Sequence, residues 1–157
     1  MEHWCLSMGA VQQILLGTGM LAVSALVHVG VIALSVPYFR KLPHFLPLEH
    51  WPRLRIATFL SFSVFVLVFA HTVQVWTWSV TFLEITDLPD LATSFYFATV
   101  TYTTLGYGDI VPGPDARIVA TFCAITGLLT FGISTAFLIG VLSKVLPDIF
   151  DDNSRNN

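Results

Sequence analysis

The chain has 157 residues, of which 55% are hydrophobic and only 11% are charged, and its formal net charge is −3. Soluble domains carry about 25% charged residues, so this composition excludes an ordinary soluble domain and indicates a membrane protein. The small negative charge gives no sign of nucleic-acid binding. The two cysteines, Cys5 and Cys123, match neither a disulfide framework nor a zinc pattern. We therefore expect a membrane protein without a cofactor.

Three windows of the sequence contain no Asp, Glu, Lys or Arg. They cover residues 9–39, 56–83 and 118–143, and each is longer than the ~20 apolar residues that cross a bilayer. The sequence thus predicts three transmembrane helices. The amino-terminus lacks the positive start of a secretory signal, and its apolar run is too long for one, so we expect the first helix to remain in the mature protein.

The basic residues indicate how the chain threads through the membrane. Arg40, Lys41, Arg53 and Arg55 lie between the first two windows, and clustered basic residues mark the cytoplasmic side. This predicts an outer amino-terminus, an outer segment over 84–115 and a cytoplasmic acidic tail over 148–157. The small size of the chain favours a bacterial plasma membrane.

The segment between the second and third windows is too long and too apolar for a simple loop. Asp87 is a candidate N-cap and Pro89 suits a first turn, which predicts a helix over 88–102. Such a helix has about three or four turns, too few to cross the membrane. Irregular backbone at membrane depth occurs only where protein buries it or where it lines a water-filled path. The pattern indicates a re-entrant loop of a pore, and because each chain supplies one loop, several chains are needed.

Two glycines follow the predicted helix in the sequence TYTTLGYGD. Gly106 and Gly108 adopt positive φ without steric cost, so the backbone can alternate in hand and turn successive carbonyl oxygens to one side. Rings of such carbonyls replace the water shell of a cation. The stretch TTLGYGD resembles the selectivity filter of the potassium-channel family, with leucine where valine is more usual. By this resemblance, the residues that coordinate K⁺ are Thr104, Leu105, Gly106, Tyr107 and Gly108.

The resemblance extends over residues 56–146 and implies a pore domain at 51–147, after an extra helix and linker at 1–50. Within it an outer helix covers 56–83, and an inner helix covers 116–145. Gly127 lies where the family commonly has a hinge, although close packing of helices explains a glycine equally well. By the same resemblance, the residues facing a cavity below the filter are Leu128, Phe131, Thr135 and Ile139.

The residues that support the filter depart from the family pattern. Tyr96 and Phe97 stand where many members have two tryptophans. Tyr96 can still donate a hydrogen bond to Asp109, but Phe97 has no donor for Tyr107. We expect Asp109, Tyr96, Thr101 and Thr103 to support the filter. Val100 lies where some members carry a carboxylate.

The outer segment carries carboxylates that would attract cations: Glu84, Asp87, Asp90, Asp109 and Asp115. For Asp87 and Asp90, a role at the start of a helix is an equally direct explanation. His28 and His71 lie inside predicted spans. An ionisable residue there suggests function, while a neutral histidine bonded to a neighbouring helix is the simpler interpretation.

The sequence predicts an all-α membrane protein, and the resemblance implies that it assembles as a homotetramer in the lipid bilayer and conducts K⁺ selectively and passively. No helix carries arginines at every third position, as a voltage sensor requires. No residue constellation suggests an enzyme. Two alternatives stay open: a weakly selective cation channel, and a non-conducting subunit of another pore protein.

Overall fold

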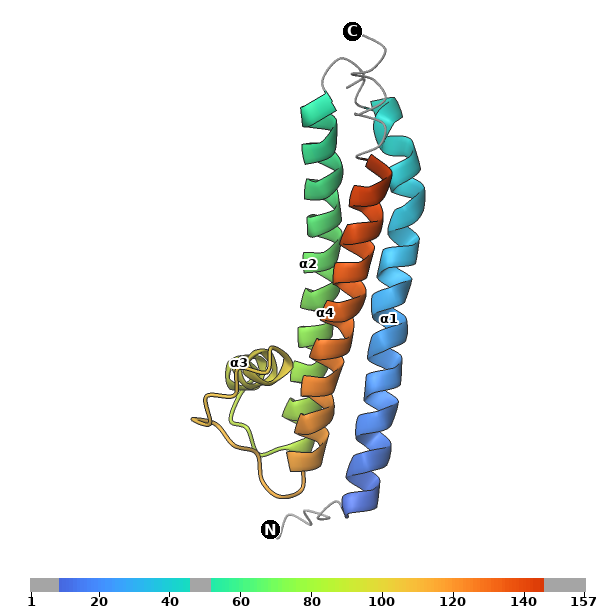
Figure 1. The fold of residues 1–157 in the computed structure, drawn as a ribbon. Helices are drawn as coiled ribbons and strands as arrows, with labels where there is room; N and C mark the ends of the chain where they lie inside the picture. The colour runs from blue at the N-terminus through green and yellow to red at the C-terminus, as the bar shows by residue number, and fades with distance from the viewer. Residues whose placement is uncertain (1–8, 46–51, 146–157) are drawn as a thin grey trace, which may run out of the picture.

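The computed structural model describes residues 9–45 and 52–145, which form four helices (Figure 1). These are α1 (Ala10–Phe45), α2 (Pro52–Ile85), α3 (Leu91–Tyr102) and α4 (Arg117–Val145). By length and composition α1, α2 and α4 can each cross a membrane, whereas α3 has only 12 residues. The predicted all-α fold with three candidate spans and one short helix is confirmed.

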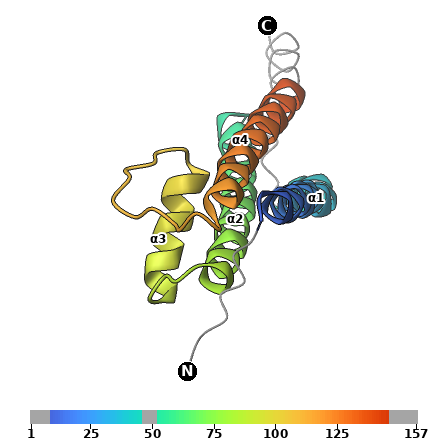
Figure 2. The ribbon, with the colours of Figure 1, turned by 90° about the horizontal axis from the view of Figure 1, so that it is seen from below.

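The three long helices run side by side, and each packs against the other two (Figure 1). The short helix α3 lies across the bundle, on the side opposite α1 (Figure 2). It packs against α2 and α4 near the end of the bundle where α1 begins. The loop that follows α3 returns to the start of α4 at that same end.

Both amino-terminal long helices extend beyond their apolar windows. The first continues from residue 39 to Phe45, and the second begins at Pro52 rather than at residue 56. Charged residues end an apolar window without breaking the helix, because the backbone hydrogen bonds do not depend on the side chains. Proline suits a first helical position, where its missing N–H leaves no bond unmade. The predicted acidic tail at 148–157 lies outside the described residues.

The predicted N-cap of the short helix was wrong. Asp90, not Asp87, caps α3: its backbone is extended, with φ −159° and ψ 170°, and its side chain accepts a 2.7 Å hydrogen bond from the Thr93 amide. Pro89 therefore precedes the helix instead of lying in its first turn. This bond from the Thr93 amide lowers the pKa of the Asp90 carboxyl. Two aspartates three residues apart offer the same capping chemistry, and only one of them lies beside free amides.

A compact apolar core joins α2, α3 and α4. Trp78 and Phe82 of α2 meet Phe97 of α3, as well as Val119 and Cys123 of α4. A side-chain bond adds to this contact, since the Ser94 hydroxyl donates to the Ser79 carbonyl at 2.5 Å. The core fixes α3 at one depth and angle, and thereby places the loop that follows it.

Helix α1 buries a polar stripe and exposes its apolar side chains. Its buried residues repeat at intervals of four and seven, and none is a large hydrophobic residue: Gln13, Gly17, Ser24, His28 and Ser35. The stripe faces α4 and α2, while Leu15, Leu26 and Leu34 are each about 70% exposed. Such a helix suits a lipid environment, because leucine gains nothing by leaving the lipid and a polar group does.

Candidate functional site

The segment after α3 folds back onto the end of that helix. Thr103 is the C-cap of α3, and its backbone amide donates to the Thr99 carbonyl at 3.0 Å. The amides of Leu105 and Gly106 both donate to the Val100 carbonyl, at 3.0 and 3.2 Å. The last carbonyls of a helix lack partners within it, and this segment supplies them. The amides of Leu105 and Gly106 therefore point toward α3.

The backbone of this segment alternates in hand. Thr104, Gly106 and Gly108 have φ values of 59°, 55° and 77°. Gly106 and Gly108 thus have the positive φ that the sequence predicted for them. The sequence did not predict a positive φ for Thr104, and this conformation costs a residue with a side chain about 1–2 kcal/mol. It is the sole non-glycine residue with positive φ in 9–45 and 52–145.

The segment is uncovered in the single chain. Residues 103–109 are all exposed, with Leu105 at 55% and Tyr107 at 67%. Among contacts outside helices in the described ranges, no backbone N–H donates to a carbonyl of 104–108. The segment thus presents a run of free acceptors beside two uncovered large side chains.

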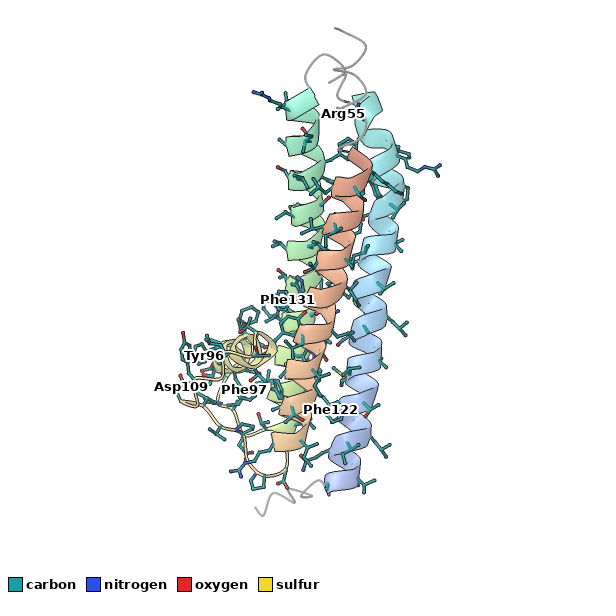
Figure 3. All side chains as sticks on the ribbon, in the orientation of Figure 1. Arg55, Tyr96, Phe97, Asp109, Phe122 and Phe131 are labelled. Atoms are coloured by element: carbon teal, nitrogen blue, oxygen red, sulfur yellow. The ribbon has the colours of Figure 1, made fainter. Side chains whose placement is uncertain are left out.

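Tyr96 and Asp109 hold the far end of the segment against α3. The Tyr96 hydroxyl donates to the Asp109 carboxylate at 2.6 Å, the bond expected from the sequence (Figure 3). This bond lowers the pKa of Asp109 and raises that of Tyr96. Phe97 instead lies in the core, with its ring 4.8 Å from that of Phe82, so it gives Tyr107 no hydrogen bond.

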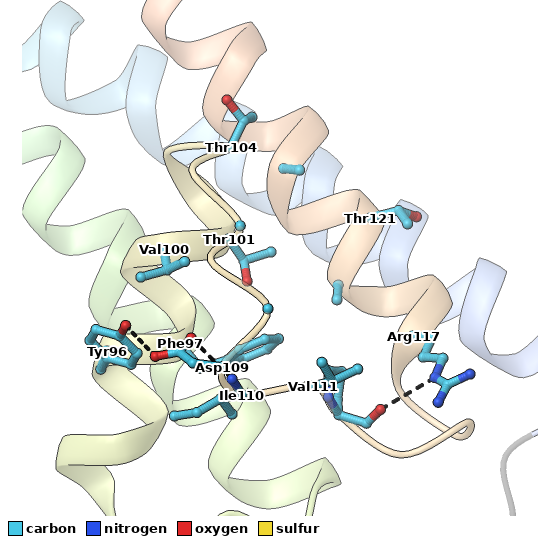
Figure 4. Close-up of a pocket in the computed structure, with 15 residues that line it drawn as sticks. Tyr96, Phe97, Val100, Thr101, Thr104, Asp109, Ile110, Val111, Arg117 and Thr121 are labelled. Carbon is cyan, nitrogen blue, oxygen red and sulfur yellow. Dashed lines mark hydrogen bonds between the residues drawn. The ribbon is translucent and has the colours of Figure 1, made fainter.

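A pocket of about 410 Å³ separates this segment from α4 (Figure 4). Thr101 and Val100 of α3 line one side, and Thr121 of α4 lines the other. Thr103 contributes differently, because its hydroxyl donates back to the Thr99 carbonyl at 2.8 Å. The two threonines named as supports thus lie in different places: Thr101 beside the segment and Thr103 on the helix end.

The residues predicted for a cavity lie along α4. Leu128, Phe131, Thr135 and Ile139 are all exposed and share one face of the helix by their spacing. Gly127 is buried, and α4 continues through it without interruption. A cavity between several chains stays a prediction.

Both membrane histidines have hydrogen-bond partners that the sequence did not identify. His71 lies 2.8 Å from the Tyr102 hydroxyl and 3.0 Å from the Ser134 hydroxyl, which is also 3.0 Å from His28. The interpretation of bonded histidines therefore has a structural basis. The available signal was that histidine buried in an apolar span needs partners, but only the fold shows which hydroxyls approach.

Comparison with known proteins agrees with this arrangement. The model of a family described as ion channel matches residues 56–144, which is more than half of the chain. This chain belongs to the ion-channel family. The match includes α3, the alternating segment and nearly all of α2 and α4, and it confirms the resemblance to a potassium-channel pore module. Helix α1 lies outside it.

Curated relatives of this ion-channel family member resemble a smaller part of it. Potassium voltage-gated channel subfamily A member 10 of Mus musculus is 43% identical over 54 residues, or 34% of this chain and 10% of that protein. The channel protein shk-1 of Caenorhabditis elegans is 43% identical over 47 residues, 29% of this chain and 9% of its own. Potassium voltage-gated channel subfamily A member 2 of Xenopus laevis is 37% identical over 54 residues, which are 34% of this chain and 11% of that protein. The chain spans about a tenth of the length of these relatives. No solved structure matches it.

Proposed function

We propose that this chain is the subunit of a homotetrameric channel that conducts K⁺ passively and selectively. The observation that carries the proposal is the alternating backbone of residues 104–108: the amides of 104–106 donate to α3, and no backbone N–H of the described residues outside helices donates to the carbonyls of 104–108. Free carbonyls from four copies around one axis would replace the hydration shell of a permeating ion. The sites for K⁺ would then lie at Thr104, Leu105, Gly106 and Tyr107.

The names of the relatives support K⁺ as the permeating ion. Each of the three is named as a potassium channel. Their names also say voltage-gated, but helices α1, α2 and α4 carry no ladder of arginines. We propose conduction without a voltage sensor in the described part of the chain.

Assembly from identical chains is supported by what one chain leaves uncovered. The irregular segment at 103–109 is exposed, and lipid cannot satisfy its polar backbone groups. Copies of this chain around a common axis would cover the sides of the segment and leave the carbonyls to the ion path.

The charges of the two ends support the proposed orientation. Arg40 and Lys41 of α1, Arg53 and Arg55 of α2, and Lys144 of α4 gather at one end of the bundle. That end would face the cytoplasm, and the amino-terminus would lie outside. At the other end the acidic residues around α3 would form an outer mouth that attracts cations.

One observation favours a less selective channel as the second candidate. Tyr107 is 67% exposed, and Phe97, which lies in the core, offers it no hydrogen bond. A filter with weaker support would hold its carbonyl rings less firmly, so Na⁺ would be rejected less strongly.

A flux assay on liposomes containing the purified protein tests the proposal, with K⁺ and Na⁺ gradients compared. The variant is Gly106→Ala, because the φ of 55° at Gly106 disfavours a residue with a side chain. The control is Gly113→Ala, because a Cβ added at Gly113 meets nothing within 4 Å. K⁺ flux far above Na⁺ flux, lost in Gly106→Ala but kept in Gly113→Ala, supports the proposal. Equal fluxes favour the weakly selective channel. Absence of flux from folded protein favours the non-conducting subunit.

A further inference from the structure

The end of α3 is attached to the two helices behind it by one tyrosine. Tyr102 is the last residue of α3, two positions before Thr104, and it is 1% exposed. Its hydroxyl lies 2.6 Å from the Thr130 hydroxyl of α4 and 2.8 Å from Nδ1 of His71 of α2. The start of the alternating segment is therefore held by a buried polar contact.

This contact continues to α1 through a serine. The Ser134 hydroxyl of α4 lies 3.0 Å from Nε2 of His71 and 3.0 Å from Nε2 of His28. His28 is fully buried, Ser134 is 6% exposed, and the two imidazole rings are 4.9 Å apart. A continuous chain of hydrogen bonds thus runs from His28 of α1 through Ser134 and His71 to Tyr102. We call these four residues the histidine relay.

The protons in the relay have to be shared. Thr130 and Ser134 can donate to the Thr126 and Thr130 carbonyls of their own helix, each at 2.8 Å. A neutral His71 has one N–H and one acceptor nitrogen, so one of its two neighbours has to donate to it. If Ser134 donates, it gives up its bond to α4. If Tyr102 donates to His71, it can only accept from Thr130, which then gives up its own bond to the Thr126 carbonyl. Each tautomer of His71 therefore tightens a different contact.

We propose that the histidine relay positions the base of the filter and couples α1 to it. His71, Ser134 and Tyr102 act as positioning residues, and His28 extends their reach to a helix outside the matched residues 56–144. Within a bilayer no water replaces a lost partner. A change at His28 therefore alters the hydrogen bonds of Ser134, and through them those of His71 and Tyr102. The inference rests on the proposed channel function.

Single substitutions at three positions test the relay. Ser134→Ala removes the shared hydroxyl, while His28→Phe and Tyr102→Phe remove polar atoms and keep a ring of similar size. The matched control is Ser63→Ala, because Ser63 is fully buried and its hydroxyl donates within α2, to the Phe59 carbonyl at 2.7 Å. The ratio of K⁺ to Na⁺ flux in liposomes is measured for each variant, normalised to folded protein.

We expect each relay variant to lower this ratio by at least about threefold, in line with usual coupling between bonded side chains. Ser63→Ala should leave the ratio unchanged, and Ser134→Thr, which keeps a hydroxyl, should restore it. A loss of stability alone would lower the amount of folded protein and leave the ratio unaltered.

The double variant His28→Phe with Tyr102→Phe decides whether α1 is coupled to the filter. If the relay carries the effect, the double variant loses little more than the stronger single variant. Multiplicative losses, or ratios equal to that of Ser63→Ala, overturn the inference. A parent protein without K⁺ preference refutes the proposed function itself, whereas a selective parent with unresponsive relay variants refutes the relay alone.

Discussion

The backbone carbonyl of Tyr102 lies directly against Gly127. A Cβ added at position 127 would overlap the carbonyl oxygen of Tyr102 and would lie 2.9 Å from its carbonyl carbon. The end of α3 therefore touches the bare backbone of α4, at the residue that the sequence suggested as a hinge or as a packing site. The packing explanation has a direct contact behind it, and the hinge stays a prediction.

Gly127→Ala should destabilise the protein by about 1–3 kcal/mol, as overpacking usually does, and should reduce K⁺ flux. The added methyl group meets backbone, which cannot turn aside as a side chain can. Gly132→Ala and Gly140→Ala are the controls, because a Cβ at either position meets nothing within 4 Å in the chain. Thermal unfolding in detergent measures the effect. A Gly127→Ala midpoint as high as those of the controls would contradict the expectation.

The Tyr96–Asp109 bond predicts how the end of the proposed filter next to Asp109 depends on pH. The bond lowers the pKa of Asp109 from 3.8. The stability that the ionised Asp109 contributes is therefore complete above pH 3.8 and is lost as the pH falls through the lowered pKa. The pKa of Tyr96 is raised from 10.0, so its contribution is lost only as pH rises through the raised pKa. For this pair, we expect K⁺ flux to be constant between about pH 5 and 9.

Tyr96→Phe removes the bond and should move the acid-side loss of flux to higher pH, because the pKa of Asp109 returns toward its ordinary value. Tyr38→Phe is the control, since Tyr38 is 62% exposed and lies near the other end of the bundle. Flux recorded across the acidic range in matched liposomes gives the result. Superimposable profiles for Tyr96→Phe and the parent would show that the bond has no part in supporting the filter.

Gln13 connects α1 to the start of α4. Its side-chain oxygen accepts from the Ile118 amide at 3.1 Å, and its side-chain nitrogen donates to the Pro114 carbonyl at 3.2 Å. Gln13→Leu should cost about 1–3 kcal/mol, since buried polar groups lose their partner. Gln12→Leu, on the exposed neighbour, should cost less. Thermal unfolding compares the two, and equal midpoints would rule out a role for Gln13 in fastening the helices.

Gly17 is the second fastening point of α1. A Cβ at this position would overlap the ring of Phe122, reaching within 2.6 Å of its Cγ. Gly17→Val should therefore push α1 away from α4, whereas Gly19→Val meets nothing within 4 Å. Spin labels on the exposed faces of the two helices report their separation. We expect a longer distance in Gly17→Val alone, and an unchanged distance would contradict close packing at this position.

The sequence predicted those parts of the fold that local chemistry decides. Apolar windows determine where spans lie, and Gly106 and Gly108 mark a backbone that needs positive φ. It could not choose between Asp87 and Asp90 as the cap, because both carry the same side chain and tertiary contacts such as that of Ser94 with Ser79 fix where α3 lies. The positive φ of Thr104 could not be predicted from the sequence either, because threonine has no local preference for it.

The position of α1 was open from the sequence, yet a signal was present. Polar and small residues recur along it at intervals of four and seven, from Gln13 to Ser35. In a soluble protein such a stripe would face water, but in lipid it faces other helices. Reading the period of the polar residues instead of the apolar ones would have predicted the buried face. The pairing of His28 with Ser134 would still have required the structure.

The polar stripe of α1 has a consequence for biogenesis. Helix α1 leaves the ribosome before α4, and the partners of Gln13 and His28, which are Ile118 and Ser134, follow 105 and 106 residues later in the chain. Until then the stripe lies in a membrane that offers it few partners. The polar side chains of α1 therefore gain these hydrogen bonds only once α4 has been made. A chain truncated before α4 would lack Ile118 and Ser134, so the Gln13 and His28 side chains would stay without these partners inside the membrane.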